Sequence, residues 1–105
     1  MEFNRNDKRL KGLSEQSIHT IQTSFEFSKK YASEENHEEL LKGIITYEKC
    51  YQQEMLGREH GLTEEQIDMM TNVNFKPKQM EMIREGFENG LTNDQVSIYA
   101  KPEFD

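Results

Sequence analysis

The stretch that decides the fold is F-K-P-K-Q-M-E-M-I-R-E-G-F-E-N-G-L-T-N-D-Q-V-S-I-Y-A-K-P-E-F, residues 75–104. Pro77 suits the first turn of a helix, where its missing N–H has no intrahelical partner. Apolar residues then recur at i, i+3 and i+7 from Met80, which is the spacing of one helical face. Gly90 stands where helices commonly end in a left-handed residue. The stretch therefore predicts a helix over 77–89 that stops sharply.

A second helix, over 93–99, is predicted directly after that glycine. Thr92 is placed to cap it, and the Gln95 side chain is placed to reach back to the backbone N–H of the cap. The same device occurs earlier in the chain with Thr63 and Gln66. G-L-T-E-E-Q-I and G-L-T-N-D-Q-V repeat at an offset of 29 residues, which predicts a partial duplication of a helical hairpin.

Three further residue pairs keep this offset. They are Gly57 with Gly86, Glu59 with Glu88, and Phe75 with Phe104. Arrays of such hairpins usually need about three units to bury a continuous core, so two units predict a compact domain instead of a solenoid. We expect Gly90→Val to cost more than about 1 kcal/mol, because a β-branched residue would be forced to positive φ. Gly86 lies inside the predicted helix, so we expect Ala to be tolerated or even preferred there.

A pattern within residues 75–104 is specific in its spacing. It consists of Phe75, Gln79, Met80, Ile83, Arg84, Gly86, Glu88, Gly90, Leu91, Tyr99, Ala100, Pro102 and Phe104. This pattern resembles a short tandem motif of accessory proteins from Gram-positive conjugative elements and phages, in which a Tyr-Ala-x-Pro-x-Phe end leads into the next Gln-Met-x-x-Ile-Arg. The resemblance covers about 30 of the 105 residues and implies a mobile-element origin, not an activity.

Three more helices are predicted upstream, over 15–32, 36–60 and 64–71. The apolar stripe of the first is Ile18, Ile21, Phe25 and Ala32, widened by Phe27 and Tyr31. The buried face of the second is Leu40, Ile44, Tyr47, Tyr51 and Met55, joined by Leu41 and Ile45. A brief extended segment is predicted at Val73 and Phe75. The fold class is all-α, a compact small domain of about five helices with a partly duplicated C-terminal hairpin unit.

The domain organisation follows from periodicity and charge. Residues 1–12 carry no helical period and are predicted to form a flexible arm. Residues 13–105 form one helical domain, with a long hairpin over 13–60 and the capped repeat over 61–105. Hydrophobic residues make up only 33% of the chain, so the core is small, and a partner or a dimer would add stability.

Composition also bears on location. There is no run of 18 apolar residues, and the N-terminus lacks an apolar signal core. Cys50 is the single cysteine and has no internal partner for a disulfide. These features predict a cytoplasmic protein that does not enter a membrane.

Acidic residues are concentrated in the middle of the chain. Residues 34–68 hold ten acids against three bases, which equals the net charge of −7 of the whole protein. One interpretation is a solvated helix face that maintains solubility. The other is a surface that imitates nucleic-acid phosphates and binds a basic protein. The predicted partner-binding residues are Glu34, Glu35, Glu38, Glu39, Glu64, Glu65 and Asp68.

No catalytic or cofactor-binding pattern is present in the sequence. The run His37-Glu38-Glu39-Leu40-Leu41 begins like a zinc-protease helix, but Leu41 stands where the second His is needed. Cys50 lies beside an apolar stripe and is predicted to be a buried or half-buried thiol, not a nucleophile. The predicted helix over 93–99 has an acid and no Arg or Lys, unlike a DNA recognition helix. We expect no enzyme, no metal, no cofactor and no direct nucleic-acid binding.

Two functions remain in agreement with the sequence. The first is a non-enzymatic inhibitor of a nucleic-acid-binding host-defence nuclease, of the anti-CRISPR or anti-restriction type, which occupies a basic groove with its acidic residues. The alternative is an adaptor or regulator of conjugation or phage functions that binds another protein through a helix face. Either protein would be a monomer or a homodimer. Salt distinguishes them, because screening weakens contacts between exposed charges and hardly affects apolar ones.

Overall fold

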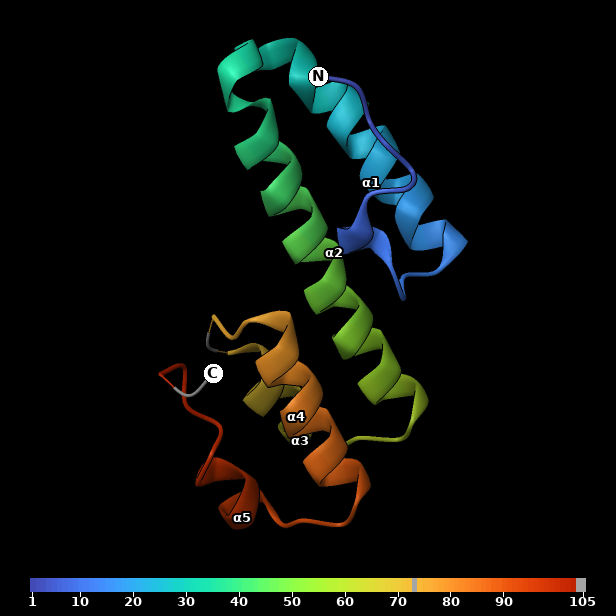
Figure 1. Cartoon of the computed structure of the whole chain (residues 1–105). Coiled ribbons are helices and arrows are strands. Elements are labelled where there is room, and N and C mark those ends of the chain that lie inside the picture. The colour runs from blue at the N-terminus through green and yellow to red at the C-terminus, as the bar shows by residue number, and fades with distance from the viewer. Residues whose placement is uncertain (73, 104–105) are drawn as a thin grey trace. The chain divides into compact units, whose positions relative to one another are not determined.

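The computed structural model describes residues 1–72 and 74–103, and these residues form helices joined by short connections (Figure 1). In chain order the elements are η1 (Lys8–Leu10), α1 (Glu15–Ser28), η2 (Lys29–Tyr31), η3 (Glu34–Asn36), α2 (His37–Glu59), α3 (Glu64–Thr71), α4 (Pro77–Glu88) and α5 (Asn93–Ser97). Within the described residues no strand is found, so the all-α prediction is confirmed. Val73 and Phe104, for which the sequence predicts an extended segment and the end of the repeat, lie outside this part.

Two helices end earlier than predicted. Helix α1 ends at Ser28, and the following turn tightens into η2 before Ala32 becomes extended. Helix α5 ends at Ser97, where the N–H of Tyr99 and that of Ala100 both donate to the carbonyl of Val96. Short 3₁₀-type turns are a common way to satisfy the last carbonyls of a helix.

The chain divides into two compact units, unit 1 over Met1–Lys49 and unit 2 over Cys50–Asp105. The sequence places a boundary after residue 60, where the long helix ends. The boundary between the two compact units falls inside α2, and the two ends of this helix contribute to different cores. The helical period of α2 continues across the unit boundary, so periodicity alone does not reveal the boundary.

The core of unit 1 lies between α1 and the first half of α2, which run side by side in Figure 1. Its buried residues are Leu10, Ile21, Phe25, Leu41 and Ile45. Ser14 caps α1 by accepting a hydrogen bond from the N–H of Ser17 at 3.1 Å. Leu10 comes from the segment for which the sequence predicts a flexible arm, and it is only 3% exposed. Residues 1–12 therefore take part in packing.

The buried face of α2 differs from the predicted one. Leu41 and Ile45 are buried, whereas Tyr47 is 73% exposed and Tyr51 and Met55 are also exposed. The predicted stripe through the two tyrosines is therefore wrong. The reason lies in the sequence itself, because the paired residues Leu40-Leu41 and Ile44-Ile45 offer two adjacent stripes at the same period. Contact with α1 decides between them.

The two aromatic residues expected to widen the stripe of the first helix also lie outside the core. Phe27 is 61% exposed and Tyr31 is 79% exposed, and their rings pack on each other with centroids 5.6 Å apart. Phe27 lies in the last turn of α1 and Tyr31 in η2, and neither joins the core of unit 1. The prediction that they belong to the buried face is wrong.

The core of unit 2 is formed by the duplicated hairpins. Its buried residues are Ile67, Met70, Phe75, Met80, Ile83, Phe87 and Val96. Gly61 and Gly90 have φ of +87° and +89°, as the glycine stops predict. After each stop the next N–H donates back by five residues, from Leu62 to Gly57 and from Leu91 to Gly86, both at 3.0 Å. This is the Schellman arrangement, and it is the same in both copies.

Each copy then continues with a complete capping box. The hydroxyl of Thr63 accepts from the N–H of Gln66 and the hydroxyl of Thr92 accepts from the N–H of Gln95, both at 3.2 Å. The Gln side chains accept in return from the backbone N–H of their threonines. The predicted duplication is therefore present in the backbone as well as in the sequence.

The prediction that Gly86 would tolerate or prefer Ala is wrong. Gly86 is buried in α4, and a Cβ at this position would overlap the hydroxyl oxygen of Tyr99. The ring carbon that carries the hydroxyl would be 3.2 Å away. Tyr99 half-buries its ring against the core of unit 2, and its hydroxyl donates to the carbonyl of Met82 at 3.4 Å. The glycine is required by a close approach, not by its own dihedral angles.

Candidate functional site

The seven predicted acidic residues are exposed and form two groups, one in each unit. The first group is Glu34, Glu35, Glu38 and Glu39, in η3 and the first turn of α2. The second is Glu64, Glu65 and Asp68, in α3. Acids favour helix starts because the free N–H groups there carry partial positive charge. The local helix physics therefore explains why the carboxylates are placed at these points.

Glu34 has partners within unit 1. Its carboxylate pairs with the Met1 ammonium, and its other oxygen lies 3.3 Å from Nδ1 of His37. The hydrogen bond from the Met1 ammonium holds the pKa of Glu34 below its usual value. His37 is buried, and its Nε2 lies 3.2 Å from the carbonyl oxygens of Lys29 and Ala32. The Glu34 carboxylate therefore has partners within unit 1 and is also exposed to solvent.

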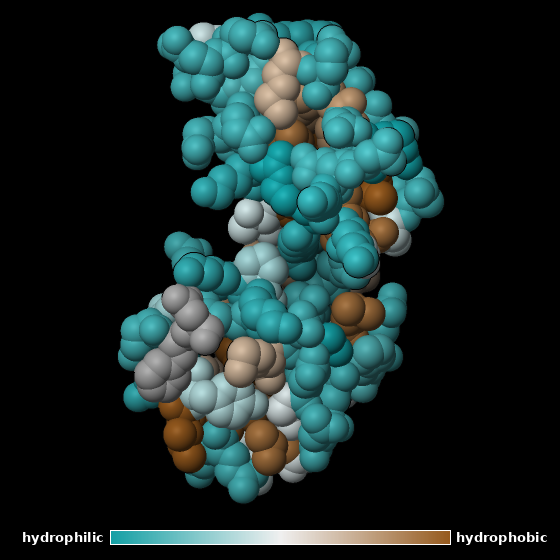
Figure 2. Space-filling model, viewed as in Figure 1, coloured by the Kyte–Doolittle hydropathy of each residue, from teal (hydrophilic) through white to brown (hydrophobic). Residues whose placement is uncertain are grey.

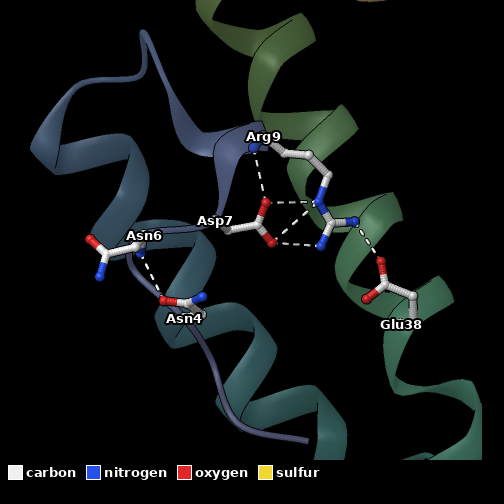
Figure 3. Close-up of polar contacts among 5 residues, drawn as sticks. All are labelled: Asn4, Asn6, Asp7, Arg9 and Glu38. Atoms are coloured by element: carbon white, nitrogen blue, oxygen red, sulfur yellow. Dashed lines mark hydrogen bonds and ion pairs between the residues drawn. The ribbon is translucent and has the colours of Figure 1, made fainter.

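Glu38 is also compensated, by a basic residue of the N-terminal segment (Figure 3). Arg9 donates from Nη1 to Glu38 at 2.6 Å and from Nη2 to Asp7 at 2.7 Å. The hydrogen bond from Arg9 lowers the pKa of Asp7, and the two carboxylates together raise the pKa of Arg9. The guanidinium lies between an acid of its own segment and an acid of α2, so Glu38 is only partly available to a partner.

Glu35 and Glu39 are different. Both are exposed, and neither has a hydrogen bond or ion pair from its side chain to any residue that the structure describes. They lie in the same first turns as Glu34 and Glu38, whose charges are partly compensated. Within this group, Glu35 and Glu39 are the carboxylates most available to a cation of a partner, because no described residue already pairs with them.

In α3 the pattern is similar. Glu64 pairs with Arg58 of α2, and Glu65 accepts a hydrogen bond from Nδ2 of Asn93 at 2.8 Å. Asp68 is exposed, and its side chain contacts no cation or donor among the described residues. The acidic residues with uncompensated carboxylates are therefore Glu35, Glu39 and Asp68.

The two units differ in net charge. Unit 1 holds nine acidic and eight basic residues, a net charge of −1. Unit 2 holds eleven acidic and five basic residues, a net charge of −6. Hydrophilic side chains cover most of the face seen in Figure 2, and the hydrophobic ones are confined to small patches. The excess negative charge therefore belongs mainly to unit 2, although four of the seven predicted residues lie in unit 1.

The sequence analysis does not single out Glu48, which lies in α2 beside Tyr47. Its side chain is 8% exposed and has no hydrogen bond or ion pair to the described residues. It lines a groove of about 430 Å³ between α1 and α2. The groove is formed by Thr20, Ser24, Glu39, Leu40, Gly43, Ile44, Tyr47 and Glu48. In the sequence, the signal that could have identified Glu48 is an acid inside an otherwise apolar helical stretch.

Cys50 is half-buried, as predicted, and its thiol donates to the carbonyl of Phe75 at 3.8 Å. Burial raises the pKa of the thiol, so the thiolate is disfavoured.

Over residues 1–72 and 74–103, no three His, Cys, Asp or Glu side chains are grouped so that they could share a metal ion. In the same residues, no helix combines the length and apolarity of a bilayer crossing.

The chain matches no protein-family model, no curated protein and no solved structure. The resemblance of residues 75–104 to the tandem motif of mobile elements therefore stays a prediction.

Proposed function

We propose that this protein is a non-enzymatic, acidic protein-binding module of a mobile element. Its partner would be a nucleic-acid-binding host-defence nuclease, and it would inhibit that nuclease by occupying the basic groove that otherwise binds phosphates. The observation that carries the proposal is the set of exposed carboxylates without partners among the described residues, Glu35 and Glu39 in first turns and Asp68 in the middle of α3. Such groups keep their full charge for an external cation.

The net charge of −7 supports the same proposal, because a field of one sign steers association with a basic partner. Most of this charge belongs to unit 2, so long-range attraction would come mainly from that unit. Glu34, Glu38 and Glu64 are already paired within the fold and would contribute less to binding. The proposal therefore gives the three uncompensated acids the larger role.

The test is a cleavage assay with candidate nucleases at low and high salt. The variant carries Glu35→Lys and Asp68→Lys, and a matched control carries Glu26→Lys and Glu85→Lys, two exposed acids outside the predicted set. Both proteins have the same net charge. We expect the first to inhibit at least about tenfold more weakly, since about 1.4 kcal/mol is tenfold. High salt should remove most of the difference.

Equal inhibition by the two variants would overturn the assignment of the acidic residues.

The alternative function, an adaptor that binds through a helix face, is favoured by one observation. Phe27, Tyr31 and Tyr47 expose most of their side chains in unit 1, and exposed aromatic residues are typical of protein interfaces. An adaptor of this kind would keep its partner in a pull-down at high salt and would inhibit no nuclease.

A further inference from the structure

We propose that the groove of unit 1 binds an arginine side chain of a protein partner, with the guanidinium on the carboxylate of Glu48. This inference rests on the proposed function only in taking the partner to be a basic protein. It adds a specific pocket for one residue, and this pocket shares only Glu39 with the exposed carboxylates that give general attraction.

The first argument is the state of Glu48. Glu48 is only 8% exposed and has no donor among the described residues. No buried side-chain oxygen of the described residues lacks a hydrogen-bond partner, so the carboxylate oxygens of Glu48 keep contact with solvent. Because Glu48 lines the groove, a cation bound there would meet a carboxylate that no residue of the fold neutralises. Buried acids are normally paired, and a cation supplied from outside would provide the partner.

The second argument is the shape and lining of the groove. Its volume of about 430 Å³ falls within the range of roughly 300–1,000 Å³ that is typical of ligand pockets. Leu40 and Ile44 are half-buried and offer apolar surface to an aliphatic stem. Gly43 has no atom within 4 Å of the place where a Cβ would stand, so the absence of a side chain there leaves the groove open.

The third argument selects arginine. The planar guanidinium can donate two parallel hydrogen bonds to one carboxylate and can stack on an aromatic ring. Tyr47 lines the groove beside Glu48 and is 73% exposed, so its ring is available for stacking. Glu39 lines the same groove, is exposed and has no intramolecular partner among the described residues, so it favours a cation there. A lysine ammonium would pair with the carboxylates of Glu39 and Glu48 but would not stack on the ring of Tyr47.

The experiment titrates the full-length ¹⁵N-labelled chain with the capped tripeptide acetyl-Gly-Arg-Gly-amide. Matched peptides carry lysine or citrulline, which is the neutral analogue of arginine. We expect saturable shifts of the amide signals of Gly43, Ile44 and Tyr47, and at least about tenfold weaker binding of the citrulline peptide. Glu48→Gln should weaken arginine binding by at least about tenfold, whereas Glu26→Gln, outside the groove, should leave it unchanged.

A second measurement separates a binding residue from a structural one. Because Glu48 has no partner in the free protein, Glu48→Gln should leave the melting temperature nearly unchanged and keep the helical circular dichroism spectrum. Tyr47→Ala, at an exposed position, should weaken arginine binding several-fold without a loss of stability.

Several results would overturn the inference. These are equal binding of the citrulline peptide, shifts confined to other parts of the chain, no shifts at all, or a lower melting temperature of Glu48→Gln. Equal binding of the lysine peptide would overturn the selection of arginine. None of these results depends on a nuclease, so the groove and the inhibitor function can fail separately.

Discussion

The two copies of the hairpin in unit 2 share their backbone hydrogen bonds but not their side-chain packing. Both have a Schellman stop and a capping box at an offset of 29 residues. At the glycine inside each first helix they differ. A Cβ at Gly57 would be 3.0 Å from Cδ1 of Ile67 and 3.1 Å from Cδ1 of Leu62, so these atoms would have to shift by a few tenths of an ångström, whereas a Cβ at Gly86 would be 1.9 Å from the hydroxyl oxygen of Tyr99. Local structure was duplicated, and packing then diverged.

The largest effect should come from the shared element. Gly90→Val places a β-branched residue at φ +89° and should lower the free energy of unfolding by about 2 kcal/mol. Gly61→Val, at φ +87°, should cost a similar amount. Urea denaturation of both variants measures the two losses. An unchanged midpoint for either variant would mean that this copy does not need its glycine stop.

The next effect should separate the copies. Gly86→Ala should destabilise by about 1 to 2 kcal/mol, because the ring of Tyr99 must move to make room. Gly57→Ala should change stability by less than about 0.5 kcal/mol, since the tight contact is offset by the better helix propensity of Ala. Denaturation midpoints provide the comparison.

A double variant sharpens this test. Tyr99→Phe removes the overlapping oxygen, so it should recover part of the loss when it is combined with Gly86→Ala. If the double variant is no more stable than Gly86→Ala alone, the hydroxyl of Tyr99 is not the cause of the loss.

A smaller effect is expected at the caps. Thr63→Ala and Thr92→Ala each remove the side-chain acceptor of a capping box and should cost about 1 kcal/mol. Thr63→Ser and Thr92→Ser keep the hydroxyl and serve as controls. Thermal melts of the four variants compare the copies directly. A loss at only one threonine would contradict the equivalence of the two boxes.

The smallest effect concerns Glu88, whose counterpart in the first copy is Glu59. Burial would raise the pKa of Glu88, but hydrogen bonds from Arg84 and His60 outweigh it and lower the pKa. A lowered pKa in the folded state gives stability that is present above the unfolded value of 4.5 and is lost as pH falls through the folded value. Screening by solvent limits this to less than about 1 kcal/mol.

Melting temperatures of wild type and Glu88→Gln between pH 7 and pH 3 measure this contribution. The difference between the two proteins should shrink below the unfolded value of 4.5. Glu59 forms no ion pair with the described residues, so Glu59→Gln should follow the wild type. If Glu88→Gln shows the same acid sensitivity as wild type, the Arg84 and His60 contacts do not stabilise the fold.

Much of the candidate site was predictable because helix starts attract acids for local reasons. All seven predicted acids are exposed, as their charge predicts, and all of them except Asp68 lie in the first turn of a helix. Which of them are compensated was not predictable. Arg9 lies 29 residues before Glu38, and the contact depends on how the N-terminal segment packs on unit 1. Glu48 was missed because its burial depends on the contact between α1 and α2.

The sequence by itself determined where most helices begin and end. The prolines, glycine stops and capping boxes act through hydrogen bonds within a few residues, so they need no distant contact. The all-α class and the duplicated hairpin follow from these local interactions.

Tertiary structure decided which stripe of α2 is buried, how far unit 1 extends and which atoms a side chain at Gly86 would meet. For α2, the pairs Leu40-Leu41 and Ile44-Ile45 satisfy the helical period in two ways, and only contact with α1 selects Leu41 and Ile45. For Gly86, the conflict is with Tyr99, which lies on a different segment. Periodicity specifies a helix, but the choice among its faces depends on the residues that pack against it.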